Sequence, residues 1–195
     1  MLVVPSFSST LITNRRRLLT RGGQAALSTA ALLVGRAAKA DSSTQTADQM
    51  KSDVETLNTA LSLEYEGIAA YEVGAHSGLL QPAVLKLAVG FQSDHKQHAE
   101  MLAKAIGQLG GTPVQPKTTA EYAFPIVNLK NQADVLRFAA GLEQGAASAY
   151  KGTVPTLNNR GLAAAMAGIL GSETMHWAIL RQALGEKPPT IAFVA

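Results

Sequence analysis

Polar side chains that can bind a metal ion recur at four places in this sequence, each within an apolar helical pattern. Two segments contain Leu-Glu followed seven residues after the Glu by Tyr, and two contain His or Glu followed three residues later by His. Residues three apart on a helix project toward one neighbouring helix, so each pair can reach a common ion. Carboxylate and imidazole groups are ligands for Fe(II) and Mn(II). The candidate metal ligands are Glu64, His95, His98, Glu143, Glu173 and His176.

Four amphipathic helices are required to bring these residues together. Apolar residues recur at spacings of three and four over residues 47–73, 82–109, 133–150 and 159–184, which predicts a helix in each range. The candidate ligands share the apolar faces of these helices, so we expect them at middle depth in a bundle. Burying several carboxylates together is costly unless cations, protons or water compensate them. The pattern therefore favours a bound metal.

The connections between these ranges predict how the helices are joined. Residues 74–81 and 154–158 are short connections, which are typical of antiparallel neighbours. Residues 110–130 are too long for an ordinary loop in a compact domain, but a bundle built from two hairpins needs one such crossover. The predicted fold is all-α, a four-helix bundle of two antiparallel hairpins with one long crossover. Pro188 and Pro189 prevent the last helix from continuing, and we expect the tail to run along the bundle or to contact a second subunit of a homo-oligomer.

This repeated hairpin, with Glu on one helix and a ligand pair on the next, resembles the ferritin-like superfamily of di-metal carboxylate proteins, and most closely its small exported members. The resemblance covers the whole chain after the leader. It implies a ferritin-like four-helix bundle with two iron ions, or two manganese ions, at its centre. Glu64 and Glu143 match the single glutamates of the family, Glu173 and His176 match one Glu-x-x-His pair, and His98 matches the second histidine. The implied activity is ferroxidase or peroxide chemistry with O2 or H2O2, including a manganese catalase-like reaction.

One position departs from the family pattern, because His95 stands where the second Glu-x-x-His pair places Glu. The change removes an anionic ligand, so the site holds two ions less symmetrically, or one ion. Asp94 is an alternative ligand if the helix is rotated. A second interpretation is a non-catalytic ferritin-like stress or structural module whose metal site is degenerate or mononuclear.

Tyr71 and Tyr150 follow Glu64 and Glu143 by two helical turns, about 10.5 Å along the axis, too far for a shared ion. Their duplicated placement indicates hydroxyls that bond to carboxylates on the antiparallel neighbours, and the family resemblance allows a catalytic redox role. The alternative is a core tyrosine with a satisfied hydroxyl. For Trp177 we expect packing, and for His76 a solvated loop position.

The first 40 residues have the features of an export signal. Arg15, Arg16 and Arg17 precede an apolar stretch at residues 25–34, and Ala38-Lys39-Ala40 has the small-x-small form that a signal peptidase cleaves. The pattern resembles a twin-arginine signal, with the general secretory route as the alternative. Both predict a periplasmic product of residues 41–195, one bundle domain with an extended tail.

Removing this leader reverses the charge of the protein. Six of the 17 Lys and Arg residues lie before Asp41, so 11 remain against all 14 Asp and Glu, a net charge of about −3. A mildly acidic domain has no electrostatic reason to bind nucleic acid or an anionic membrane, and we expect neither partner. The sequence has no cysteine, so any metal must be held by His and carboxylate groups.

Overall fold

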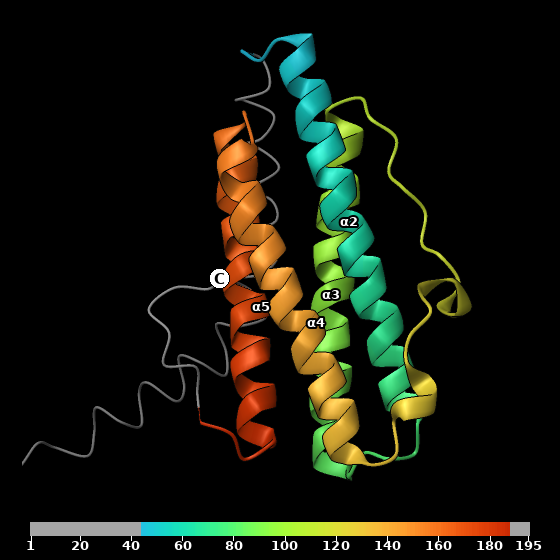
Figure 1. The fold of residues 1–195 in the computed structure, drawn as a ribbon. Helices are drawn as coiled ribbons and strands as arrows, with labels where there is room; N and C mark the ends of the chain where they lie inside the picture. Colours follow the sequence, from blue (N-terminus) through green and yellow to red (C-terminus); the bar gives the residue numbers. More distant parts are fainter. Residues whose placement is uncertain (1–43, 188–195) are drawn as a thin grey trace, which may run out of the picture.

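A computed structural model describes residues 44–187 and contains four long helices and no strand in that range. The helices are α2 (Ala47–His76), α3 (Pro82–Gln108), α4 (Gln132–Thr153) and α5 (Arg160–Ala183) (Figure 1). This confirms the predicted all-α bundle, and each predicted helix is found within three residues of its expected ends. The predicted export signal of residues 1–40 and the tail beyond residue 187 lie outside the described residues. None of the described helices is long and apolar enough to cross a membrane.

The helix ends follow from local sequence signals. Thr46 begins α2 with a capping box, in which its side chain accepts from the Gln49 amide while the Gln49 side chain accepts from the Thr46 amide. Asn131 and Asn159 cap α4 and α5 in the same way, each accepting from a backbone amide three residues later. Such caps satisfy amides that have no partner within the helix. Gly110, with φ +78, follows the end of α3 in the left-handed conformation that glycine adopts most easily.

The helices pair as two antiparallel hairpins. α2 packs along α3, α4 packs along α5, and the hairpins meet through α2 with α4 and α3 with α5. The crossover leaves the end of α3 and runs along the outside of the bundle to the opposite end, where α4 begins (Figure 1). This is the connection expected for two similar hairpins joined once.

The crossover is ordered by its own contacts. It contains the short 3-10 helices η1 (Thr119–Tyr122) and η2 (Ile126–Asn128). The Asn58 side chain on α2 donates to the Thr112 carbonyl and accepts from the Val114 amide, at 3.1 and 2.8 Å. Further along, the Phe124 ring lies between the rings of Tyr122 and Phe138, at 5.4 and 5.5 Å. These contacts explain how a long connection is fixed on a compact domain.

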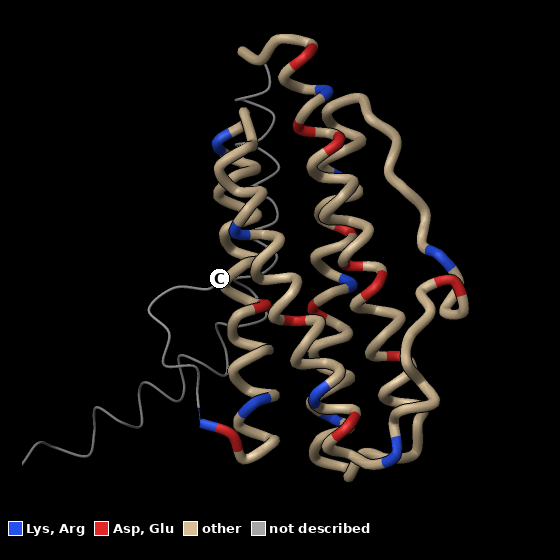
Figure 2. Tube along the Cα trace, in the orientation of Figure 1, with Lys and Arg blue, Asp and Glu red and all other residues tan. Residues whose placement is uncertain are grey.

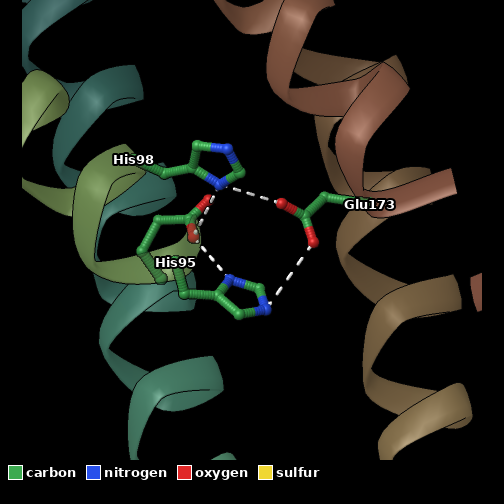
Figure 3. A group of neighbouring side chains, drawn as sticks. His95, His98 and Glu173 are labelled. Carbon is green, nitrogen blue, oxygen red and sulfur yellow. Dashed lines mark hydrogen bonds and ion pairs between the residues drawn. The ribbon is translucent and has the colours of Figure 1, made fainter. Parts of the chain in front are cut away.

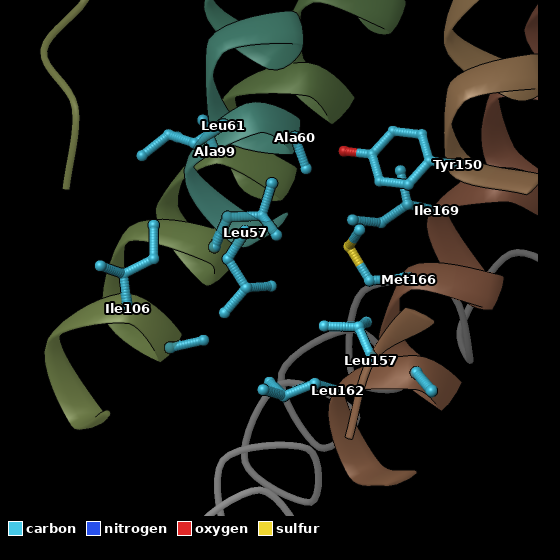
Figure 4. Close-up of a cluster of buried hydrophobic side chains, with 13 residues drawn as sticks. Leu57, Ala60, Leu61, Ala99, Ile106, Tyr150, Leu157, Leu162, Met166 and Ile169 are labelled. Atoms are coloured by element: carbon cyan, nitrogen blue, oxygen red, sulfur yellow. The ribbon is translucent and has the colours of Figure 1, made fainter. Parts of the chain in front are cut away.

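Two apolar clusters fill the bundle and leave a polar layer between them. The larger cluster, which includes Leu61, Leu102 and Met166, occupies the end near the α4–α5 connection (Figure 4). The smaller cluster, which includes Phe91 and Trp177, occupies the other end. Acidic positions also occur at mid-length of the bundle on both hairpins (Figure 2). The six candidate ligands lie in this middle layer, where the expected mid-depth position is confirmed.

The two hairpins are tied together by Asp53, whose importance the sequence does not reveal. Its buried carboxylate accepts from the Asn158 and Asn159 amides at 2.8 and 2.9 Å, and from the side chains of Asn158 and Gln45 at 3.0 and 2.8 Å. The α4–α5 connection, which includes the 3-10 helix η3 (Val154–Thr156), is thereby fixed to α2.

We expect Asp53→Ala to destabilise the protein by about 3 kcal/mol, because it leaves the buried Asn159 amide and the Asn158 amide without their acceptor. Glu55→Ala, an exposed position on the same helix, should change stability by less than about 0.5 kcal/mol. Urea unfolding of both variants measures the difference. Equal effects would mean that Asp53 does not hold the connection.

Candidate metal centre

The six candidate ligands converge in one buried layer from all four helices. Glu64 comes from α2, His95 and His98 from α3, Glu143 from α4, and Glu173 and His176 from α5. All are buried except His98, whose side chain is 16% exposed. The structure thus brings together every residue that the sequence singled out.

Their donor atoms form two overlapping groups, each with its atoms within 4.8 Å of one another. The first group contains Glu64, His95, His98 and Glu173, and the second contains His95, Glu143, Glu173 and His176. Glu173 belongs to both and faces both: its Oε1 lies 3.1 Å from His98 Nδ1, and its Oε2 lies 3.5 Å from His176 Nδ1. Figure 3 shows Glu173 pointing across the bundle at the two histidines of α3. A carboxylate in this position can bind one ion with each oxygen.

Five buried donor atoms in this layer have no hydrogen-bond partner. They are His98 Nδ1, His176 Nδ1, Glu143 Oε2 and both carboxylate oxygens of Glu173. Buried polar atoms are nearly always bonded, so five orphans in one place need an explanation. All five are oxygen or nitrogen donors of the types that divalent first-row metals accept. The residues present therefore fit a metal centre.

The family comparison agrees with this geometry. A family model described as ferritin-like domain matches residues 52–186. The chain belongs to the ferritin-like family. Among solved structures, a ferritin-like, diiron-carboxylate protein from Bacillus anthracis is similar, with a TM-score of 0.57, 24% identity and coverage of 70% of this chain and 97% of that one.

A second solved structure, a conserved hypothetical protein from Mycobacterium tuberculosis, has a TM-score of 0.62 and 23% identity, and covers 74% of this chain and 99% of that one. At these identities the likeness shows the fold. No curated protein matches the chain at a significant level.

His95, the departure from the ferritin-like pattern, lies between the two halves of the site. Its Nδ1 is 2.7 Å from Glu64 Oε2, and its Nε2 is 3.3 Å from Glu143 Oε1. Gly67 makes room for the ring, because a Cβ at Gly67 would lie 3.0 Å from His95 Nδ1 and Cε1. Gly67 on α2, which has no side chain, thus leaves the space that the imidazole ring of His95 on α3 occupies.

The structure places Asp94, the alternative ligand, outside both donor groups. Asp94 is absent from both donor groups, and its Oδ2 lies 3.2 Å from His176 Nε2 instead, on the side of the ring away from the site. The helix is not rotated, because His95 occupies the buried face. Asp94 therefore orients His176, whose Nδ1 faces Glu143 and Glu173 at 3.3 and 3.5 Å.

We expect Asp94→Ala to weaken metal binding by about 10-fold, the low end for a residue that orients a ligand, since its side chain is 43% exposed. The ring of His176 would lose the bond that fixes its orientation. Mn(II) titration against a competing chelator measures the change, with the exposed Glu100→Ala on α3 as the matched control. If Asp94→Ala and Glu100→Ala bind Mn(II) equally, Asp94 does not position the ligand.

The two tyrosines hold carboxylates of the opposite hairpin, as expected from their spacing. The Tyr71 hydroxyl donates to Glu143 Oε1, and the Tyr150 hydroxyl donates to Glu64 Oε1. Burial and the adjacent carboxylates raise the pKa of both hydroxyls well above the usual value, so both stay protonated donors. A redox role for them stays a prediction.

The carboxylates and imidazoles of the site shift each other's pKa values strongly. Burial disfavours imidazolium, but the surrounding carboxylates outweigh it and raise the pKa of His95 to about 10, of His98 to about 9 and of His176 to about 11. Burial would raise the pKa of Glu64, yet contact with His95 and His98 lowers it to about 2. Burial would also raise the pKa of Glu143, but contact with His176 and His95 lowers it. For Glu173, burial prevails and raises the pKa. Protons on the imidazoles therefore compensate the glutamates, and a metal must displace them.

Aromatic packing around the site carries less sequence signal. Phe91 stacks on His176 with ring centroids 4.0 Å apart, a contact that no spacing rule predicts. Trp177 is buried in the smaller cluster, as expected. His76 is the last residue of α2 and not part of the loop that was predicted, but its side chain is solvated, as expected, with 74% exposed.

Proposed function

We propose that this ferritin-like protein binds two divalent first-row metal ions, with Fe(II) as the native metal and Mn(II) as an alternative, and handles O2 or H2O2 at the centre. The observation that supports this most is the set of five buried donors around Glu173 that make no hydrogen bond within the described residues, four of which face one another only at ion-pair distance. Bound iron would supply the electrons that reduce O2 or peroxide.

The side chains of the protein would hold the ions in place, and the apolar clusters would shield them from water. One ion would be held by Glu64, His98 and Glu173, and the other by Glu143, His176 and Glu173. The tyrosine hydroxyls fix the two outer carboxylates, and apolar clusters lie on both sides of the layer. We further propose that the chain is exported to the periplasm, most simply by the twin-arginine route, which carries folded proteins.

A second candidate is a non-catalytic module with one ion or none. It is favoured by His95, because both of its ring nitrogens lie against carboxylates of the site, Glu64 and Glu143. A protonated His95 can neutralise part of the charge that a second ion would otherwise balance.

Metal content distinguishes the candidates. Residues 41–195, purified from the exported compartment without chelators, are measured by elemental mass spectrometry against protein concentration. About two irons or manganese ions per chain support the proposal, and O2 or H2O2 consumption on adding Fe(II) then tests the reaction. One ion per chain favours the mononuclear module, and no metal with no Fe(II) uptake refutes a metal centre. Glu64→Ala combined with Glu143→Ala is the matched variant expected to lose metal.

A further inference from the structure

An apolar cavity of about 290 Å³ lies against the metal centre. Tyr71, His95 and Glu143 form part of its wall, and these same residues contact one another in the centre. Most of the remaining wall is apolar and comes from all four helices, for example from Leu63, Val84, Leu136 and Leu180. One part of the cavity wall is therefore formed by residues of the candidate metal centre, and the rest is apolar.

Small residues create this space. Gly67 and Ala70 on α2 and Ala139 and Ala146 on α4 line it, at positions on facing helices where larger side chains would fill the bundle. Gly141 and Gly145, which are exposed, also line the cavity, so it opens to solvent. A cavity retained beside reactive side chains is the usual form of a ligand site.

We infer that this cavity binds an uncharged, mainly apolar organic molecule, with one end against Glu143 and His95. The volume is about twice that of a 150 Å³ apolar cavity known to take benzene, which suits a substituted aromatic ring or a medium alkyl chain. Among the described residues the lining holds no Lys or Arg, and the one cationic group in it, His95, is already paired with Glu64 and Glu143, so no free positive charge is left for an anion. An ammonium group would lose its hydration against an apolar wall.

The size of the cavity also excludes larger occupants. An α-helix with side chains is about 10 Å wide and rises about 5.4 Å per turn, so a cavity of about 290 Å³ is smaller than one helical turn. A single side chain from a second copy of the chain would fit. The sedimentation experiment below distinguishes that occupant from a small molecule. Binding of the molecule does not require metal; only its role as a substrate of the centre rests on the proposed function.

The test follows 4-fluorotoluene by ¹⁹F NMR with metal-free residues 41–195. The protein is expected to bind the probe saturably. Ala139→Leu and, separately, Ala146→Leu fill the cavity and should weaken binding at least about 10-fold, since a leucine occupies much of the space. Ala167→Leu, an exposed position on α5, is the matched control and should bind as the unchanged protein does. Absent binding, or equal binding by both cavity variants and the control, overturns the inference.

Position relative to the metal centre is tested with the loaded protein. Bound Mn(II), which is paramagnetic, should broaden the bound-probe resonance far more than Zn(II) does. Equal broadening would place the probe elsewhere and overturn the inference, whereas failure of either metal to bind would count against the proposed function alone. Sedimentation at several concentrations identifies the remaining case: an oligomer that Ala139→Leu dissociates would show that a second copy fills the cavity, and would also overturn it.

Discussion

Glu173→Gln is expected to lower the affinity for Mn(II) by at least about 100-fold and to prevent binding of a second ion. Glu173 is the one carboxylate shared by both donor groups, and neither of its oxygens has a hydrogen-bond partner. The amide has nearly the same shape but no charge, and its NH2 group cannot bind metal. Both ions would lose the same ligand, so the effect should exceed that of changing Glu64 or Glu143 alone.

The fold itself should tolerate this substitution. Glu173 is fully buried, and a neutral group costs less to bury than a carboxylate. We therefore expect the metal-free variant to melt at the temperature of the unchanged protein or above it, while the rise in melting temperature caused by metal disappears. Calorimetry with and without Mn(II) measures both quantities, and Glu100→Gln is the exposed control. Two ions bound with unchanged affinity would contradict the shared role of Glu173.

The second large effect is an opposite pH dependence of the metal-free and metal-loaded proteins. The three histidines have raised pKa values of about 9 to 11 in the folded state, against 6.5 as the ordinary value. Their contribution to stability is therefore complete below about pH 6.5 and is lost as pH rises through these values. Glu64, with its pKa lowered to about 2, contributes above its ordinary value of 4.5 and loses that contribution as pH falls. The metal-free protein should be most stable between about pH 4.5 and 6.5.

Between about pH 6.5 and 8.5, the free energy of unfolding falls by about 1.4 kcal/mol per pH unit for each histidine that is protonated in the folded state but not in the unfolded state. Each such proton corresponds to roughly 3 to 6 °C in melting temperature per pH unit. Metal binding should strengthen over the same range, because unprotonated imidazoles are the ligands. The difference in melting temperature between Mn(II)-loaded and chelator-treated protein should therefore widen as pH rises.

Scanning calorimetry across this pH range, with Mn(II) or with a chelator, measures that difference. His98→Gln should reduce the slope of the metal-free protein, whereas His76→Gln, an exposed position on α2, should leave it unchanged. A metal-free melting temperature that does not fall above neutral pH would show that the imidazoles are not protonated in the folded site.

Several features of the site could be read from residue spacing. Glu64 and Glu143 share the apolar stripe of their helices, and a polar residue on such a stripe has to be buried with partners. The repeat of Glu and Tyr seven residues apart also indicated tyrosine hydroxyls bonded to carboxylates of a neighbouring helix, and the structure supplies the partners: Glu143 for Tyr71 and Glu64 for Tyr150.

Other features could not be read from spacing, because they depend on the rotation and separation of helices. Asp94 was a reasonable alternative ligand by sequence, and only the observed rotation of α3 places it behind His176. Asp53 looks like an ordinary helix residue, although three of its four hydrogen bonds reach a connection more than 100 residues away. The role of Gly67 cannot be predicted from the sequence, because it depends on the ring of His95 lying against it.

The sequence alone therefore determined the four helices, their joining into two hairpins and the identity of the six candidate ligands, since helical periodicity and buried polarity are local properties. The tertiary structure decided which donors share an ion position, which side chains orient them and where an apolar cavity remains. These depend on distances between side chains of different helices, which no spacing along one chain specifies.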